Sequence, residues 1–135
     1  MAAIAAGGRL MARMLIVDGE NSQRRALSAG LSVEGFEVVF AASFQDAMFT
    51  LGSSPVDVAM IDLMMPDLNG LELARHIRHA FPRVRVVLSS AYHLSARQVE
   101  RADCGAVAFV PKPYQVGEIC RFLRAKTSVL APASC

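Results

Sequence analysis

Two acids and a lysine stand where they could handle a phosphoryl group and a divalent cation. Asp62 ends the apolar run Val58-Ala-Met-Ile-Asp62, Asp18 follows a second run, and Lys112 follows a third. Open α/β folds keep their chemistry at the carboxyl ends of their strands, so these three side chains would meet at one edge of a sheet. Two carboxylates beside an ammonium group suit phosphate together with a metal ion.

Five apolar runs position these residues, and stretches with helical periodicity separate them. Continuous Val, Ile, Leu and Met runs are typical of parallel strands covered on both faces. We therefore predict an α/β fold, a doubly wound (βα)5 unit with one five-stranded parallel sheet and right-handed crossovers. The expected strands are 14–17, 37–41, 56–61, 84–89 and 106–110.

The expected helices differ in how much apolar surface they bury. The helix over about 22–34 has Asn21 or Ser22 as N-cap, and Pro82 ends the helix over about 70–80. The helix over 95–103 offers little apolar surface, so it is held loosely. Residues spaced i, i+3, i+4, i+7 mark the buried stripes of the second and last helices: Phe44, Ala47, Met48 and Leu51, then Val116, Ile119, Cys120 and Leu123.

Length and composition fit one domain over 13–128, with a leader over 1–12 and a tail over 129–135. The chain has 135 residues and 53% apolar content, yet no apolar run approaches the roughly 20 residues of a membrane span. The net charge of +2 is too small to indicate nucleic acid. The three cysteines form no Cys-x-x-Cys pair, and no signal sequence is evident, which favours the reducing cytoplasm.

From about residue 14 to residue 126 the chain resembles the receiver domains of two-component response regulators, the CheY-like family. The resemblance implies a sheet order of 2-1-3-4-5. It also implies phosphorylation of Asp62 by a histidine kinase or a histidine phosphotransfer protein. Such a domain is not an enzyme beyond its own phosphoryl transfer and dephosphorylation. The matching motifs, in order at strand ends, are Val17-Asp18, Asp62 with Met65-Pro66-Asp67-Leu68-Asn69-Gly70, Ser90-Ala91 and Lys112-Pro113.

The resemblance implies a role for each residue of the site. Asp62 attacks the phosphoryl donor and becomes an acyl phosphate. Lys112, aimed by a cis peptide bond to Pro113, pairs with phosphoryl oxygens as a point charge, and Ser90 offers its hydroxyl. Phe109 is either a switch aromatic or plain core. The expected Mg²⁺ ligands are Asp18, Asp62 and the backbone carbonyl of Met64.

One departure from the family concerns metal binding. A second acid usually follows the first, and here that position is Gly19. We expect weak Mg²⁺ binding, because Mg²⁺ needs only one or two carboxylates and keeps several waters. Glu20 could reach the metal, or it could be a solvated acid at the start of the first helix. The alternative is a degenerate receiver that binds partners without being phosphorylated.

Two enzyme classes fit the sequence less well. A haloacid dehalogenase-type phosphatase needs a second acid where Met64 stands, and a nucleotide-binding fold needs a glycine-rich loop after the first strand. Signalling would instead pass to a downstream protein through the helix over 95–103, the last strand and the last helix. We expect no direct nucleic-acid or membrane contact. A homodimer that forms on phosphorylation is a further possibility that the sequence does not decide.

Overall fold

A five-stranded parallel sheet forms the centre of the protein in the computed structural model, which describes residues 12–18, 24–63, 65, 68–90, 106–111 and 117. The strand order is β2-β1-β3-β4-β5, as predicted. Every neighbouring pair is parallel. The strands are β1 (Ala12–Val17), β2 (Phe36–Ala41), β3 (Val58–Asp62), β4 (Arg85–Ser90) and β5 (Ala106–Pro111).

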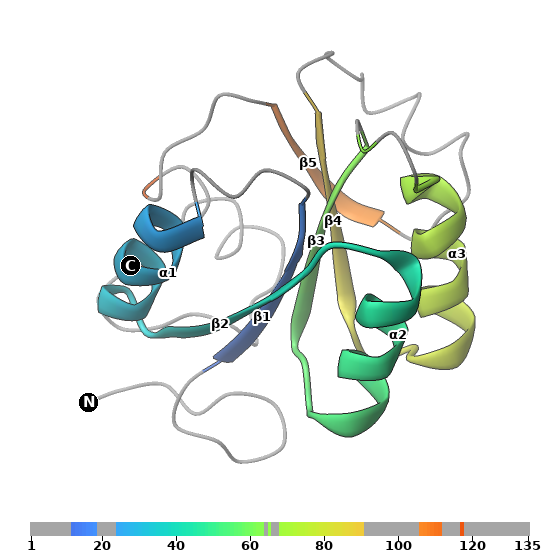
Figure 1. The fold of residues 1–135 in the computed structure, drawn as a ribbon, viewed down its shortest axis with the longest axis horizontal. Helices are drawn as coiled ribbons and strands as arrows, with labels where there is room; N and C mark the ends of the chain where they lie inside the picture. Colours follow the sequence, from blue (N-terminus) through green and yellow to red (C-terminus); the bar gives the residue numbers. More distant parts are fainter. Residues whose placement is uncertain are drawn as a thin grey trace.

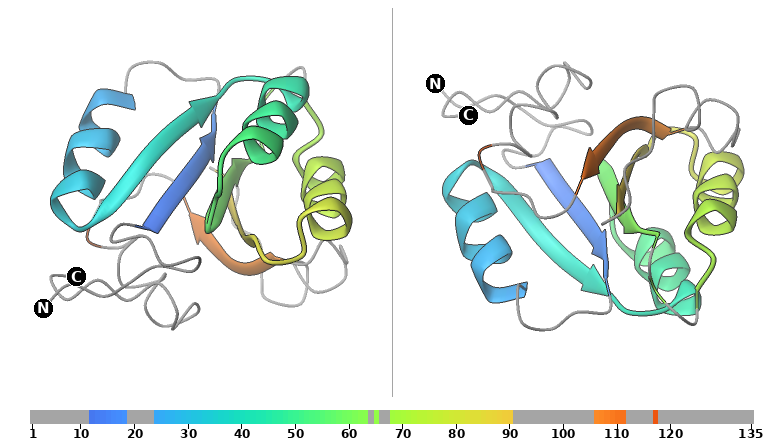
Figure 2. Two further views of the ribbon diagram at one scale, coloured as in Figure 1. Left: turned by 90° about the horizontal axis from the view of Figure 1, so that it is seen from below. Right: turned by 90° about the horizontal axis from the view of Figure 1, so that it is seen from above.

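Helices cover both faces of this sheet (Figures 1 and 2). Helix α1 (Arg24–Val33) lies on one face, and α2 (Phe44–Ser53) and α3 (Gly70–Ala80) lie on the other. The doubly wound fold class is therefore confirmed for this part of the chain. The helices expected over 95–103 and 116–123, the leader and the tail lie outside the described residues, apart from Gly117 and from Ala12, which begins β1.

The core between the sheet and α2 and α3 uses every second residue of each central strand, as the two-residue period of a strand requires. Ile61 and Leu88 belong to it, together with Leu73 and Ile77, which were expected to bury α3. Neither Met60 nor Ile16 belongs to this cluster, and both are buried. They therefore project to the opposite face, where α1 lies.

Two strands begin later than the apolar runs suggested. β3 begins at Val58 rather than at residue 56, because the Asp57 carboxylate accepts a hydrogen bond from the Arg13 amide at 2.8 Å. β4 begins at Arg85, because the Val84 amide donates to the Phe81 carbonyl at 3.0 Å and closes a turn. Hydrogen bonds, one of them between residues 44 positions apart, thus set these two boundaries rather than hydrophobicity.

Capping and one close packing contact position α3 near the end of β3. The Asn69 side chain accepts a hydrogen bond from the Glu72 amide at 3.2 Å and caps the helix. Gly70 is its first residue. A Cβ atom there would lie 2.8 Å from Leu63 Cδ2 and 3.1 Å from Ile61 Cγ2. A side chain at this position would require the end of the Leu63 side chain to move, so glycine lets the helix start close to Asp62 without that shift.

Candidate functional site

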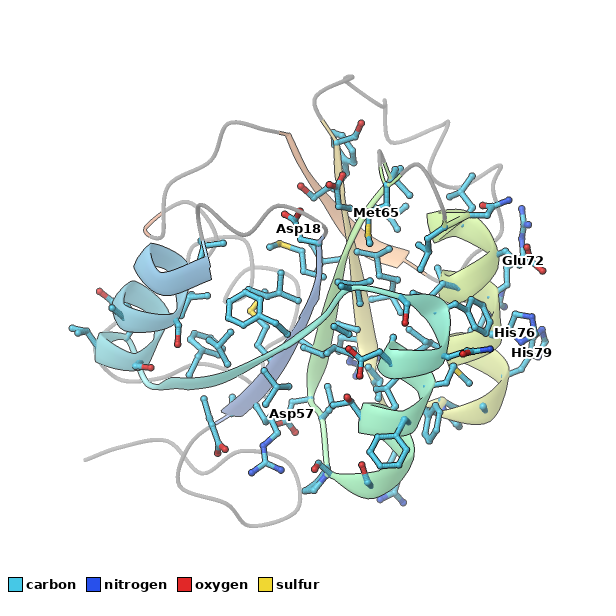
Figure 3. All side chains as sticks on the ribbon, viewed as in Figure 1. Asp18, Asp57, Met65, Glu72, His76 and His79 are labelled. Atoms are coloured by element: carbon cyan, nitrogen blue, oxygen red, sulfur yellow. The ribbon has the colours of Figure 1, made fainter. Side chains whose placement is uncertain are left out.

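Asp62 is the last residue of β3 and lies in the middle of the carboxyl edge of the sheet. It is 6% exposed. Figure 3 shows Asp18 and Met65 at this end of the sheet, and Asp57 at the opposite end. The structure thus places the predicted phosphoryl acceptor where a parallel sheet presents its strand ends.

Asp18 lies beside Asp62. The register pairs Val17 with Ile61, so the residues that follow them are neighbours. The Asp18 amide donates to the Ala41 carbonyl at 3.2 Å, which continues the β1–β2 ladder by one residue. Asp18 is 4% exposed. Adjacent strands lie about 4.8 Å apart, so two buried carboxylates share a small volume.

Ser90 and Phe109 lie close to this edge, on the neighbouring strands. Ser90 ends β4, is buried, and pairs in register with Pro111, the residue before Lys112. Phe109 pairs with Leu88 and is half-buried against the core formed with α2 and α3. Its position suits both interpretations of this aromatic, core residue or switch, and the switch role stays a prediction.

Several predicted site residues lie outside the described residues: Gly19, Glu20, Met64, Lys112 and Pro113. The metal-ligand roles of Glu20 and Met64, the role of Lys112 and the cis peptide bond therefore stay predictions. Asp18 and Asp62 alone fit a magnesium ion, since Mg²⁺ commonly binds through one or two carboxylates and retains water. Within the part of the chain that the structure describes, no group of three or more His, Cys, Asp or Glu side chains could hold a metal.

Sequence reasoning missed one residue of this edge, Ser89. It pairs in register with Asp62 and is 1% exposed. The Leu63 amide donates to the Ser89 carbonyl at 2.8 Å and fixes the two strands at this level. The signal available in the sequence was the serine doublet, since two consecutive residues of a strand must face opposite sides.

A cavity of about 330 Å³ lies elsewhere, where α2 leads into β3 and α3 leads into β4. Its lining includes Leu51, Pro55, Phe81 and Val84. These segments precede the amino ends of their strands, opposite the acidic edge. This cavity is therefore separate from the candidate site.

No helix among the described residues is long and apolar enough to cross a membrane.

Comparison with known proteins agrees with this geometry. Residues 14–124 match the response regulator receiver domain, and the chain belongs to that family. It is 34% identical over 107 residues to the regulatory protein AtoC of Escherichia coli, covering 79% of this chain and 23% of AtoC. It is 31% identical over 113 residues to the response regulator MprA of Mycolicibacterium vanbaalenii, covering 84% of this chain and 49% of MprA.

Solved structures show the same similarity. The response regulator TrrA of Thermotoga maritima, in complex with Mg²⁺-BeF, has a TM-score of 0.73 and 29% identity, covering 85% of this chain and 98% of TrrA. A second response regulator from Thermotoga maritima has a TM-score of 0.77 and 25% identity, covering 87% of this chain and 98% of that one. The chain spans about a quarter of the length of AtoC and about half of the length of MprA.

Proposed function

We propose that the chain accepts a phosphoryl group on Asp62 and signals through contacts with other proteins. The observation that supports this most strongly is the buried Asp62 carboxylate at the carboxyl edge, directly beside the buried Asp18. Family membership adds that response regulators receive phosphoryl groups from histidine kinases. The donor would accordingly be a histidine kinase or a histidine phosphotransfer protein.

The transfer is a simple displacement at phosphorus. A carboxylate oxygen of Asp62 attacks the phosphorus atom, the bond between phosphorus and the donor breaks, and its electron pair leaves with the donor. The product is an acyl phosphate. Catalysis of such a step consists mainly of positioning and charge neutralisation. Lys112 would supply a fixed positive charge to the phosphoryl oxygens, and Ser90 would donate a hydrogen bond to one of them.

Magnesium would bind at the same edge. Asp18 and Asp62 would hold it, with the Met64 carbonyl, and Glu20 would be a further ligand if its side chain reaches. The ion supplies positive charge that offsets the phosphoryl oxygens and the repulsion between the two carboxylates. With Gly19 in place of a second acid, we expect this binding to be weak. The similarity to TrrA, whose structure is a complex with Mg²⁺-BeF, supports magnesium binding by this chain.

Output would pass to a downstream protein through β5 with Phe109, the helix over 95–103 and the last helix. We expect the domain to act in the cytoplasm as a signalling module rather than as an enzyme.

A degenerate receiver is the second candidate. It is favoured by Gly19, which stands where the family usually has a second acid. Such a domain would bind its partner whether or not a phosphodonor is present. Binding of beryllofluoride, a phosphoryl mimic, in the presence of Mg²⁺ separates the two candidates.

The direct test is labelling with acetyl phosphate and Mg²⁺, followed by mass spectrometry of the intact protein. The wild type should gain one phosphoryl group that hydroxylamine removes, and Asp62→Asn should gain none. Asp57→Asn is the matched control: it alters another buried acid, at the opposite edge, and should keep the label. A label that persists in Asp62→Asn would refute the acceptor assignment. A wild type that takes neither the label nor beryllofluoride would establish the degenerate receiver.

A further inference from the structure

Ser89 is the neighbour of Asp62 on the side away from Asp18. The register pairs the two residues across β3 and β4. Asp18 directly follows β1 and lies at the corresponding level, because Val17 pairs with Ile61. One row across three adjacent strands therefore reads carboxylate, carboxylate, hydroxyl, with the proposed acceptor in the middle.

All three side chains of this row project from the same face of the sheet. Ile61 and Leu88 belong to the core formed with α2 and α3, as does Val17. Successive side chains of a strand alternate between faces, so Asp62, Ser89 and Asp18 project to the other side. Ser90 follows Leu88 by two residues and shares its face. The two serines of the doublet thus approach the acceptor from different sides of the sheet.

The Ser89 hydroxyl is buried, and it has no hydrogen-bond partner among the described residues. The side chain is 1% exposed, and its Oγ is one of two such buried atoms. Leaving a buried hydroxyl unsatisfied costs about 1–3 kcal/mol. Unsatisfied buried groups are few in native proteins and call for a physical explanation. The register places the Asp62 carboxyl group on the adjacent strand, and adjacent strands lie about 4.8 Å apart.

We infer that Ser89 is a positioning residue of the phosphorylation site, whose hydroxyl donates a hydrogen bond to the Asp62 carboxyl oxygen that does not bond to phosphorus. This inference rests on the proposed function of Asp62. Ser90 would donate to the phosphoryl group instead. The two serines therefore act on opposite ends of the acyl phosphate.

The chemistry of the hydrolysis step determines whether Ser89 speeds or slows the loss of the phosphoryl group. Water attacks phosphorus, the bond between phosphorus and the Asp62 oxygen breaks, and its electron pair returns to the carboxylate. One water proton goes to solvent and phosphate is released. Negative charge therefore grows on the Asp62 carboxyl group as the bond breaks. A donor on its other oxygen stabilises that charge, so Ser89 accelerates loss of the phosphoryl group.

Replacing each serine with alanine should have opposite consequences. Ser89→Ala should lengthen the lifetime of the acyl phosphate roughly three- to tenfold. This factor is the free energy of one hydrogen bond converted into a ratio of rate constants. The labelled fraction at steady state should rise. Ser89→Thr keeps the hydroxyl and should return the lifetime to within about twofold of wild type. Ser90→Ala should instead slow labelling by acetyl phosphate and lower the labelled fraction.

A second measurement needs no phosphorylation. In the unmodified protein, the NMR resonance of the Asp62 carboxyl carbon should shift in Ser89→Ala and return in Ser89→Thr. The Asp57 carboxyl carbon, at the other edge, should stay in place as an internal reference. A lifetime and an Asp62 resonance that are both unchanged in Ser89→Ala, in a wild type that does accept the label, would overturn the inference alone. Failure of the wild type to accept any label would overturn the proposed function. In that case, an unchanged Asp62 resonance in Ser89→Ala would also rule out the hydrogen bond from Ser89 to Asp62.

Discussion

Among the residues that the structure describes, three aspartates are buried to a similar degree, yet their surroundings differ. Asp57 accepts a hydrogen bond from the Arg13 amide at 2.8 Å and exchanges backbone hydrogen bonds with two strands, so its burial is structural. Asp18 and Asp62 lie side by side at the other end of the sheet. Two neighbouring carboxylates repel each other unless a cation offsets their charge. At the scale of the residue, the groups around each acid therefore indicate a structural role for Asp57 and a binding role for the pair Asp18 and Asp62.

Gly19 should limit the affinity of this site for Mg²⁺. Gly19→Asp adds a carboxylate ligand beside Asp18 and should tighten Mg²⁺ on the order of tenfold, about 1.4 kcal/mol. Calorimetry at fixed ionic strength measures both affinities. Glu20→Gln should weaken binding only if Glu20 contributes a ligand in place of the missing acid. Equal Mg²⁺ affinity in wild type and Gly19→Asp would contradict this expectation.

At the scale of the element, the amino ends of the central strands are joined by Asp57. Its carboxylate accepts from the Arg13 amide on β1, its amide donates to the Arg13 carbonyl at 2.8 Å, and its carbonyl accepts from the Arg85 amide on β4 at 3.0 Å. One residue just before β3 thereby connects both neighbouring strands. This contact keeps β1, β3 and β4 aligned, and the same alignment sets Asp18, Asp62 and Ser89 in one row at the far edge.

Asp57→Ala should destabilise the fold by about 1–3 kcal/mol, because it leaves the Arg13 amide without its acceptor. Glu37→Ala is the control on the same arginine. It removes the ion pair between Arg13 and Glu37, at 3.0 Å with side chains 19% and 49% exposed, which should contribute less than about 1 kcal/mol. Urea denaturation gives the free energy of unfolding for each. If Glu37→Ala lowers the free energy of unfolding as much as Asp57→Ala does, then the ion pair, rather than the hydrogen bond from the Arg13 amide to the Asp57 carboxylate, holds these strands together.

At the scale of the whole molecule, the fold places Asp62, the proposed acceptor, and Phe109 on neighbouring parts of one sheet. Phe109 pairs with Leu88, Leu88 pairs with Ile61, and Ile61 precedes Asp62. A phosphoryl group adds a charge of about −1.5 to −2 at pH 7. Drawing Ser90 toward that charge would alter the end of β4 and hence its contact with β5.

Amide hydrogen exchange with Mg²⁺ and beryllofluoride tests this route. Rates should change in β5, in the segment 95–103 and in the last helix, and α2 should keep its rates as an internal control. Exchange should stay unchanged throughout in Asp62→Asn treated in the same way. Changes restricted to α1 and α2 would place the output on a different face.

The sequence by itself determined the fold class, the strand order through its family motifs, and the identity of Asp18 and Asp62 as strand-end acids. Those features depend on the local period of hydrophobic residues and on the order of the motifs, and both are properties of the linear sequence. The start of α3 at Gly70, its end at Ala80 and the buried stripe of α2 followed in the same way.

Only the tertiary structure decided which residues are neighbours across strands. The pairing of Ser89 with Asp62 depends on the register of β3 against β4, and the start of β3 depends on Asp57 meeting Arg13, 44 positions away along the chain. Hydrophobic pattern gives each strand its faces but leaves its alignment against the next strand open. The position of the Ser89 hydroxyl beside Asp62, the proposed acceptor, therefore follows only from that alignment.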